Sequence, residues 1–95
     1  MNYRLEVQFE AIVDMKRAYD WYENRRQGLG ADLINEIEDC YTSICDKPER
    51  FGLVQGNIAY RRARVHRFPY IIVFVVAEDT VIVSRLKHIK QNITL

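Results

Sequence analysis

Hydrophobic and polar residues alternate over Asn2–Phe9, the first segment of the chain. Tyr3, Leu5, Val7 and Phe9 fall on one side, and polar residues separate them. A period of two residues is typical of a strand with one buried face. The pattern therefore predicts a β-strand over this segment.

Two segments with helical spacing follow, at about Glu10–Gln27 and about Ala31–Lys47. Each carries an apolar stripe at intervals of three and four residues, as an amphipathic helix requires. The stripes consist of Ile12, Met15, Tyr19 and Tyr22 in the first segment, and of Leu33, Ile34, Ile37, Tyr41 and Ile44 in the second. The turn Gly28-Leu29-Gly30 separates the segments, and Pro48 ends the second because the residue before a proline disfavours helical geometry. We therefore expect two antiparallel helices.

The segment Pro48–Asn57 contains a proline and two glycines, and is predicted to be a loop. Alternation resumes over Ile58–Arg67, which predicts a strand with two different sides. One side holds Tyr60, Arg62, Arg64 and His66, and the other holds Ala59, Arg61, Ala63, Val65 and Arg67. The first side is polar throughout, so we expect it to face solvent or a ligand.

The most apolar segment, Tyr70–Ala77, is hydrophobic on both sides, which predicts a strand in the middle of a sheet. A turn at Glu78-Asp79 leads into a return strand over Thr80–Leu86, so these two strands should form a hairpin. The tail Lys87–Leu95 has no periodicity and is expected to be irregular. The order β-α-α-β-β-β predicts an α+β fold, in which a helical hairpin packs on one face of a small antiparallel sheet and leaves the other face open.

The composition fits a single domain over residues 1–95, because 95 residues hold one core. With 48% hydrophobic and 28% charged residues, the chain resembles an ordinary globular protein. Its net charge of +1 hides a division, since residues 1–59 carry a net charge of −4 and residues 60–95 one of +5. The basic part suits RNA, DNA or an acidic protein partner, without choosing among them.

Several function classes are disfavoured. The longest apolar run, Phe68–Ala77, is much shorter than the roughly 20 residues that cross a bilayer, so no membrane association is expected. The first ten residues lack the pattern of an export signal, which favours a cytoplasmic protein. Cys40 and Cys45 diverge by about 140° around the second predicted helix, so we expect free thiols. Metal-ligand spacing and dinucleotide or phosphate-loop motifs are missing from the sequence, so we expect no metal and no cofactor.

Basic residues concentrate in the predicted sheet, where Ile58–Arg67 alone holds four arginines. The candidates for binding a nucleic acid or another target are Tyr60, Arg61, Arg62, Arg64, Arg85, Lys87 and Lys90. Guanidinium groups suit phosphate because they are planar, permanently charged, bidentate donors. The structural alternative is that these charges guard an edge strand against aggregation, or pair with the acidic helices.

Two histidines, His66 and His88, could act as an acid or a base near neutral pH. His88 is the better candidate because Lys87 and Lys90 lie beside it, although a lone histidine often has only a structural role. Cleavage of RNA by its own 2′-hydroxyl needs an acid, a base and cations around the phosphate, but no metal. This sequence contains such groups.

Five features follow one another along the chain: Gly28-Leu29-Gly30 before an acidic amphipathic helix, Lys47-Pro48-Glu49-Arg50-Phe51, the arginine-rich strand, Arg67-Phe68-Pro69-Tyr70 opening an apolar strand, and His88 near the end. Together they resemble the RelE/ParE superfamily, the toxins of type II toxin–antitoxin pairs. The similarity covers nearly the whole chain, and the family fold agrees with the one predicted from periodicity. It implies a growth-inhibiting toxin, of the kind often called a plasmid stabilisation protein, that is neutralised by a cognate antitoxin.

The resemblance implies one of two mechanisms. ParE-like members poison DNA gyrase, and the glycine turn and the Phe68-Pro69-Tyr70 opening are similar to theirs, so this mechanism is our main expectation. RelE-like members are metal-independent endoribonucleases that cut messenger RNA on the ribosome, and by motif Arg67 and His88 would then be catalytic. The chain departs from that pattern because no tyrosine follows Leu86 and the loop at 48–57 lacks a lysine pair.

Operator DNA should be contacted only through the antitoxin. An alternative from another class is a non-toxic protein that binds nucleic acid, or an inert protein that only binds an antitoxin. A toxin should arrest growth when it is produced alone, whereas either alternative should leave growth unimpeded.

Overall fold

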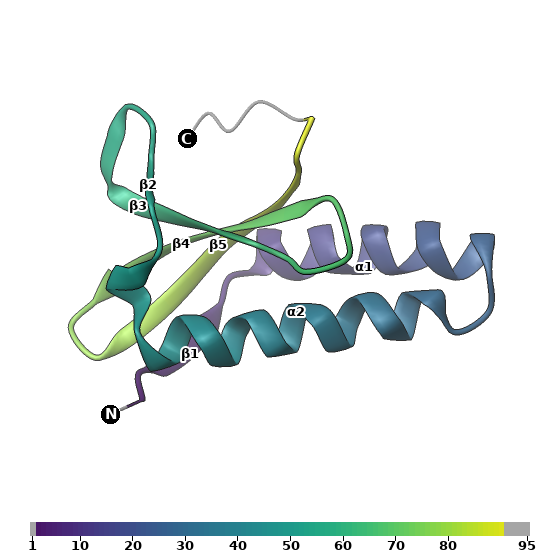
Figure 1. Ribbon diagram of the computed structural model, residues 1–95, viewed down its shortest axis with the longest axis horizontal. Helices are drawn as coiled ribbons and strands as arrows, with labels where there is room; N and C mark the ends of the chain where they lie inside the picture. The colour runs from purple at the N-terminus through teal and green to yellow at the C-terminus, as the bar shows by residue number, and fades with distance from the viewer. Residues whose placement is uncertain (1, 91–95) are drawn as a thin grey trace.

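The computed structural model describes residues 2–90, which form two α-helices, one 3-10 turn and five strands (Figure 1). In chain order these elements are β1 (Arg4–Val7), α1 (Phe9–Arg25), α2 (Leu29–Asp46), η1 (Pro48–Arg50), β2 (Leu53–Val54), β3 (Asn57–Arg64), β4 (Tyr70–Ala77) and β5 (Thr80–His88). The predicted α+β class and its succession of strand, helical hairpin and three strands are confirmed. Neither helix of the described chain has the length and hydrophobicity of a membrane-spanning segment.

The predicted boundaries need three corrections. The segment Pro48–Asn57 is not simply a loop, because it contains η1 and the two-residue strand β2, which is too short for an alternating pattern to reveal. The strand β3 ends at Arg64 instead of Arg67, where a turn begins. At the other end of the sheet, β5 continues through His88, so the predicted irregular tail starts two residues later. Its last five residues, 91–95, lie outside the described residues.

The strands form one sheet in the order β1-β5-β4-β3-β2. As predicted, β4 lies in the middle and forms an antiparallel hairpin with β5. The expectation of a purely antiparallel sheet is wrong, because β1 runs parallel to β5 with Arg4 opposite Thr80 and Val7 opposite Val83. Hydrophobic alternation identifies the buried side of a strand but carries no information about the direction of its neighbour.

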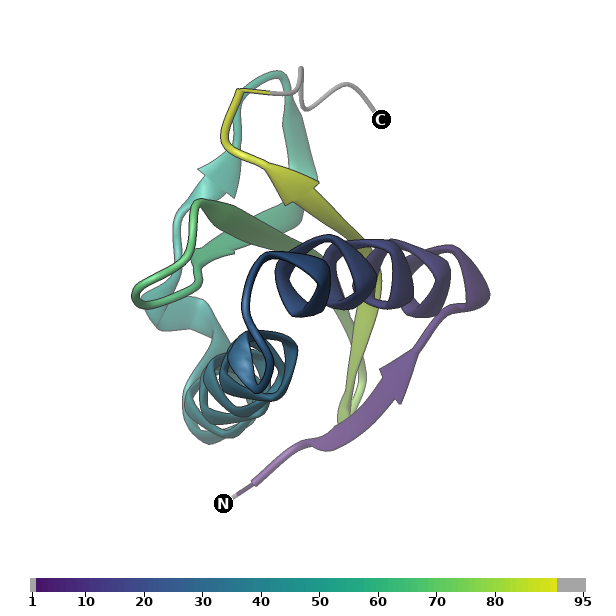
Figure 2. The same cartoon turned by 90° about the vertical axis from the view of Figure 1, so that its right-hand side faces the viewer.

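Both helices cover one face of the sheet, and the core lies between them and the strands (Figure 2). The buried cluster includes Leu33, Ile37 and Ile44 from α2, Ala63 and Val65 from β3 and the loop after it, and Ile72, Phe74, Val81, Val83 and Leu86 from the hairpin. The stripe predicted for α2 is confirmed apart from the half-buried Ile34. On α1 the stripe is rotated: Ala11 and Ala18 are buried, whereas Ile12 is 51% exposed. Small side chains let α1 approach its neighbours closely, at positions that a search for large apolar residues overlooks.

The turn between the helices is fixed by Glu23, near the end of α1. Its carboxylate accepts hydrogen bonds from the backbone N–H groups of Gly28 and Gly30, both at 2.9 Å. Gly28 has a φ of 91°, a conformation that favours glycine. A Cβ at Gly30 would lie only 2.7 Å from the ring of Tyr19 and 2.9 Å from the Glu23 carboxylate. The Gly-Leu-Gly sequence therefore allows both the reversal of the chain and the close contact between the helices.

Replacing Gly30 with alanine is expected to destabilise the fold by about 1–3 kcal/mol, because the added methyl group overpacks this contact. Urea unfolding followed by circular dichroism measures the change. The matched control is Gly52→Ala, where an added Cβ meets no atom within 4 Å. Equal stability of the two variants would contradict the close contact at Gly30.

Candidate functional site

The face of the sheet opposite the helices carries rows of residues that are aligned across three strands. Directly paired residues on neighbouring strands point to the same side of a sheet. Because Ile72 and Phe74 belong to the core, their neighbours on β4 point to the other side. We call this second side the open face, and its three rows are Arg62–Val73–Arg85, Arg64–Ile71–Lys87 and Tyr60–Val75–Ile82.

The open face thus has an aliphatic centre on β4 with cations on both sides. Arg62 and Arg64 stand on β3, and Arg85 and Lys87 stand opposite them on β5. The structure therefore brings together five of the predicted binding residues, including Tyr60. Because Asp14 pairs with Arg85, the net positive charge of this face comes from Arg62, Arg64 and Lys87. That charge favours the approach of an anionic or acidic partner.

The cations of the open face differ in whether other groups of the chain bind their side chains. Arg64 donates a hydrogen bond to the carbonyl oxygen of Phe68 at 3.0 Å, and Arg85 is bound to Asp14. Within residues 2–90, neither Arg62 nor Lys87 forms a hydrogen bond or an ion pair through its side chain. These two side chains are therefore available for a partner.

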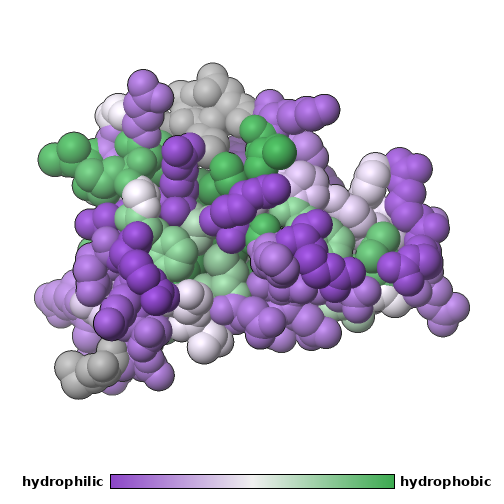
Figure 3. Space-filling model, in the orientation of Figure 1, coloured by the Kyte–Doolittle hydropathy of each residue, from purple (hydrophilic) through white to green (hydrophobic). Residues whose placement is uncertain are grey.

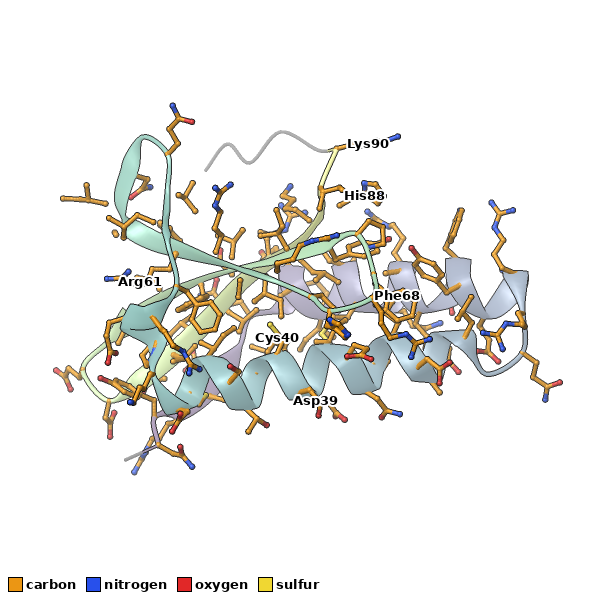
Figure 4. All side chains as sticks on the ribbon, in the orientation of Figure 1. Asp39, Cys40, Arg61, Phe68, His88 and Lys90 are labelled. Carbon is orange, nitrogen blue, oxygen red and sulfur yellow. The ribbon has the colours of Figure 1, made fainter. Side chains whose placement is uncertain are left out.

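Arg61 lies apart from this face, as its place in the alternation predicts. It pairs with Phe74 on the helix-covered side and donates a hydrogen bond to the carbonyl oxygen of Phe51 at 2.6 Å. Figure 4 shows it at the β2 end of the sheet, far along the sheet from His88 and Lys90. This hydrogen bond joins Arg61 to the segment that follows η1. The role of Arg61 in binding stays a prediction.

Asp14, a residue of α1, holds Arg85 in place. Beyond Val83 the edge of β5 is no longer covered by β1, and α1 passes there instead. The Asp14 carboxylate accepts hydrogen bonds from the Arg85 guanidinium at 2.7 and 3.0 Å, and from the backbone N–H of Leu86 at 3.0 Å. Burial alone would raise the pKa of Asp14, but these hydrogen bonds and the charge of Arg85 outweigh it, and the pKa is lowered.

Arg67 occupies a different place from the open-face cations. It lies in the turn between β3 and β4 and has a φ of 72°, which is outside the range of a β-strand. The alternation of strand side chains therefore does not apply to Arg67. Its guanidinium lies 3.6 Å from the carboxylate of Glu36 and 3.9 Å from that of Asp32, both on α2. Arg67 is therefore held beside the second helix.

His88 lies on the helix-covered side of the sheet, next to α1. It pairs with Tyr70 across the hairpin, and the two rings make an edge contact with centroids 5.3 Å apart. Its Nδ1 accepts a hydrogen bond from the backbone N–H of Lys90 at 3.1 Å. His88 and Tyr70 both line a pocket of about 470 Å³ beside α1. The two catalytic candidates, Arg67 and His88, thus lie against different helices.

The tip of the β2–β3 hairpin is a feature that the sequence did not single out. Figure 3 shows hydrophobic side chains gathered there, and Ile58 is 89% exposed and Leu53 45% exposed. Ile58 has the same alternation as Tyr60 and Arg62, so it extends the open face. A single isoleucine three residues before the first arginine of the strand gives little signal in a sequence.

The two cysteines are free thiols, as predicted. Burial raises the pKa of Cys40 to about 11 and also raises that of Cys45. Within residues 2–90 no group of three or more histidine, cysteine and acidic side chains could hold a metal ion.

Comparison with known families identifies the chain. A profile of the family described as "ParE toxin of type II toxin-antitoxin system, parDE" matches residues 5–93, nearly the whole length. The chain belongs to the ParE toxin family. Comparison with curated protein sequences gives no match.

Solved structures share the fold of this ParE-family toxin. The chromosomal ParDE system of P. aeruginosa matches with a TM-score of 0.80 and 16% identity, over 90% of this chain and 95% of that one. A double mutant of the E. coli toxin RelE in the free state matches with a TM-score of 0.71 and 15% identity, over 95% of this chain and 86% of that one. The RelBE2 toxin–antitoxin complex of Mycobacterium tuberculosis matches with a TM-score of 0.66 and 16% identity, over 93% of this chain and 92% of that one. At these identities the likeness concerns the fold.

Proposed function

We propose that this ParE-family toxin arrests bacterial growth in the cytoplasm by poisoning DNA gyrase, and that a cognate antitoxin neutralises it. The family match over residues 5–93 supports the toxin role. The choice of gyrase rests on one observation: the Arg67 guanidinium faces carboxylates of α2, whereas His88 faces α1. The antitoxin is supported by the structural neighbours, two of which are toxin–antitoxin systems.

Cleavage of RNA requires an acid, a base and cations around a single phosphate. Here Arg67 is held by two carboxylates of α2, and His88 lies in the pocket beside α1. The cations of the open face stand on the other side of the sheet. This arrangement suits a surface that binds its target better than a site that cuts RNA.

Production of the chain alone in bacteria tests the proposal, with growth, transcript integrity and DNA supercoiling measured together. We expect arrest with loss of gyrase-dependent supercoiling and with intact transcripts. The variants Arg67→Ala and His88→Ala should remain toxic. The Arg67 side chain is 49% exposed, and water screens its ion pairs, so their loss should cost only about 1 kcal/mol and this variant should stay folded. Cut transcripts that disappear in both variants would contradict the gyrase mechanism.

The second candidate is RelE-like cleavage of messenger RNA on the ribosome. It is favoured by the two cation rows of the open face, which suit a phosphate backbone. The same induction experiment separates the candidates, because cleavage leaves cut transcripts and normal supercoiling. Unimpeded growth would favour an inert or purely binding protein.

A further inference from the structure

The pocket beside α1 has aromatic walls. Trp21 and Tyr22 come from α1, and Tyr70 comes from the start of β4. Tyr22 packs edge-on against both of the other rings, with centroids 4.8 Å from Trp21 and 6.2 Å from Tyr70. Both tyrosines are half-buried, whereas Trp21 is 51% exposed. The pocket, at about 470 Å³, is large enough for a bulky side chain.

The rim of this pocket is positively charged. Arg17 and Lys90 are exposed lining residues, and neither forms an ion pair within residues 2–90. Figure 4 shows Lys90 close to His88 at the same end of the sheet. The carboxylate that lines the pocket, Asp14, is already bound by Arg85. An acidic group that enters therefore meets cations whose charge is not neutralised.

We propose that this pocket, the α1 pocket, binds a bulky apolar side chain of the antitoxin together with a carboxylate adjacent to it in the antitoxin sequence. The inference rests on the proposed function, since it assumes that an antitoxin binds the chain. A buried apolar anchor in a pocket often carries much of the binding energy of an interface. The cationic rim binds the carboxylate and selects acidic segments over neutral ones.

Small probes test this chemistry without the antitoxin. N-acetyl-phenylalanine joins an aromatic ring to a carboxylate, and N-acetyl-phenylalaninamide is its neutral counterpart. In NMR titrations at low salt, we expect the acid to shift the indole N–H signal of Trp21, the single tryptophan of the chain. The amide should bind about threefold more weakly, because it lacks the charge. Equal affinity for both probes, or no shift with the acid, would overturn the assignment.

Titration of the full-length antitoxin encoded beside this chain tests the occupant. The variants Trp21→Ala and Arg17→Glu should each weaken the complex by about tenfold, the first through lost apolar contact and the second through charge. Matched controls are Phe9→Ala, at a residue 73% exposed and outside the pocket, and Arg26→Glu, at an exposed arginine beyond the end of α1. Melting temperatures measured in parallel check that all four variants are folded.

The outcomes separate this proposal from the proposed function. If the chain arrests growth and the antitoxin relieves it, but both pocket variants bind as tightly as the controls, the α1 pocket is not the docking site and the toxin role stands. If growth is not arrested, the proposed function fails, and the affinities of the two probes still decide what the pocket binds.

Discussion

Replacing Asp14 with alanine is expected to reduce the free energy of unfolding by about 2–3 kcal/mol. The substitution leaves the backbone N–H of Leu86 without its acceptor and the Arg85 guanidinium without its counter-charge. The Asp14 side chain is only 9% exposed, but Arg85 is 35% exposed, and water reduces the cost on the arginine side. Chemical denaturation at pH 7 measures the loss.

The same residue should make the stability depend on pH. Burial opposes ionisation of Asp14, yet the hydrogen bonds from Arg85 and Leu86 lower its pKa below the usual value of 3.8. A carboxyl group whose pKa is lower in the folded state stabilises the fold above its unfolded pKa. That contribution is lost as the pH falls from 3.8 through the lower folded pKa. We therefore expect part of the acid destabilisation between neutral pH and pH 3 to disappear in Asp14→Asn.

The matched control for both measurements is Asp20→Asn, on the same helix. Asp20 pairs with Lys16 on the surface at 2.6 Å, and its side chain is 51% exposed. An exposed pair of this kind contributes about 0.3–0.5 kcal/mol, so the control should unfold almost as the parent does. If Asp14→Ala were no less stable than Asp20→Asn, the contact between α1 and the edge of β5 would not stabilise the fold.

The elements that could be predicted from sequence are those whose signal is local. Tyr70–Ala77 is apolar on both sides, and the structure places it in the centre of the sheet. The glycine turn and the stripe on α2 depend likewise on neighbouring residues. The parallel pairing of β1 with β5 joins residues 76 positions apart, Arg4 and Thr80, and leaves no mark in either segment.

The candidate site shows the same division. Alternation correctly separated Arg61 from Arg62 and Arg64, because these residues lie within one strand. It could not reveal that Asp14 binds Arg85, since the two lie in different elements and meet only after folding. Nor could it place Arg67, whose positive φ interrupts the alternation and turns the residue toward α2. Local pattern identified the open face, and tertiary contacts determine which of its cations are available.

The functional test with the largest expected effect uses the open-face cations whose side chains are not bound within the described chain. Arg64 and Arg85 are tied to the Phe68 carbonyl and to Asp14, so changing them alters the fold as well as the surface. Arg62 and Lys87 lie in adjacent rows of the open face, and no hydrogen bond or ion pair within residues 2–90 involves their side chains. Their replacement should change binding and leave the packing intact.

The double variant Arg62→Glu with Lys87→Gln is expected to lose growth arrest when it is produced alone, because its charge no longer attracts an acidic target surface or a phosphate backbone. Glutamine is chosen at position 87 because a carboxylate there would repel Asp14, whose pKa the charge of Lys87 helps to lower. Colony survival after induction measures the effect, and thermal unfolding checks the fold.

The control for this variant makes the same change of net charge elsewhere, with Arg26→Glu and Lys47→Gln at exposed positions after the two helices. If net charge alone governed toxicity, the two double variants would behave alike. A toxic control beside a harmless open-face variant would locate the target contact on the sheet, whether that target is gyrase or RNA. Full toxicity of the open-face variant would instead show that these rows do not contact the target. The exposed apolar tip of the β2–β3 hairpin around Ile58 would then become the next surface to test.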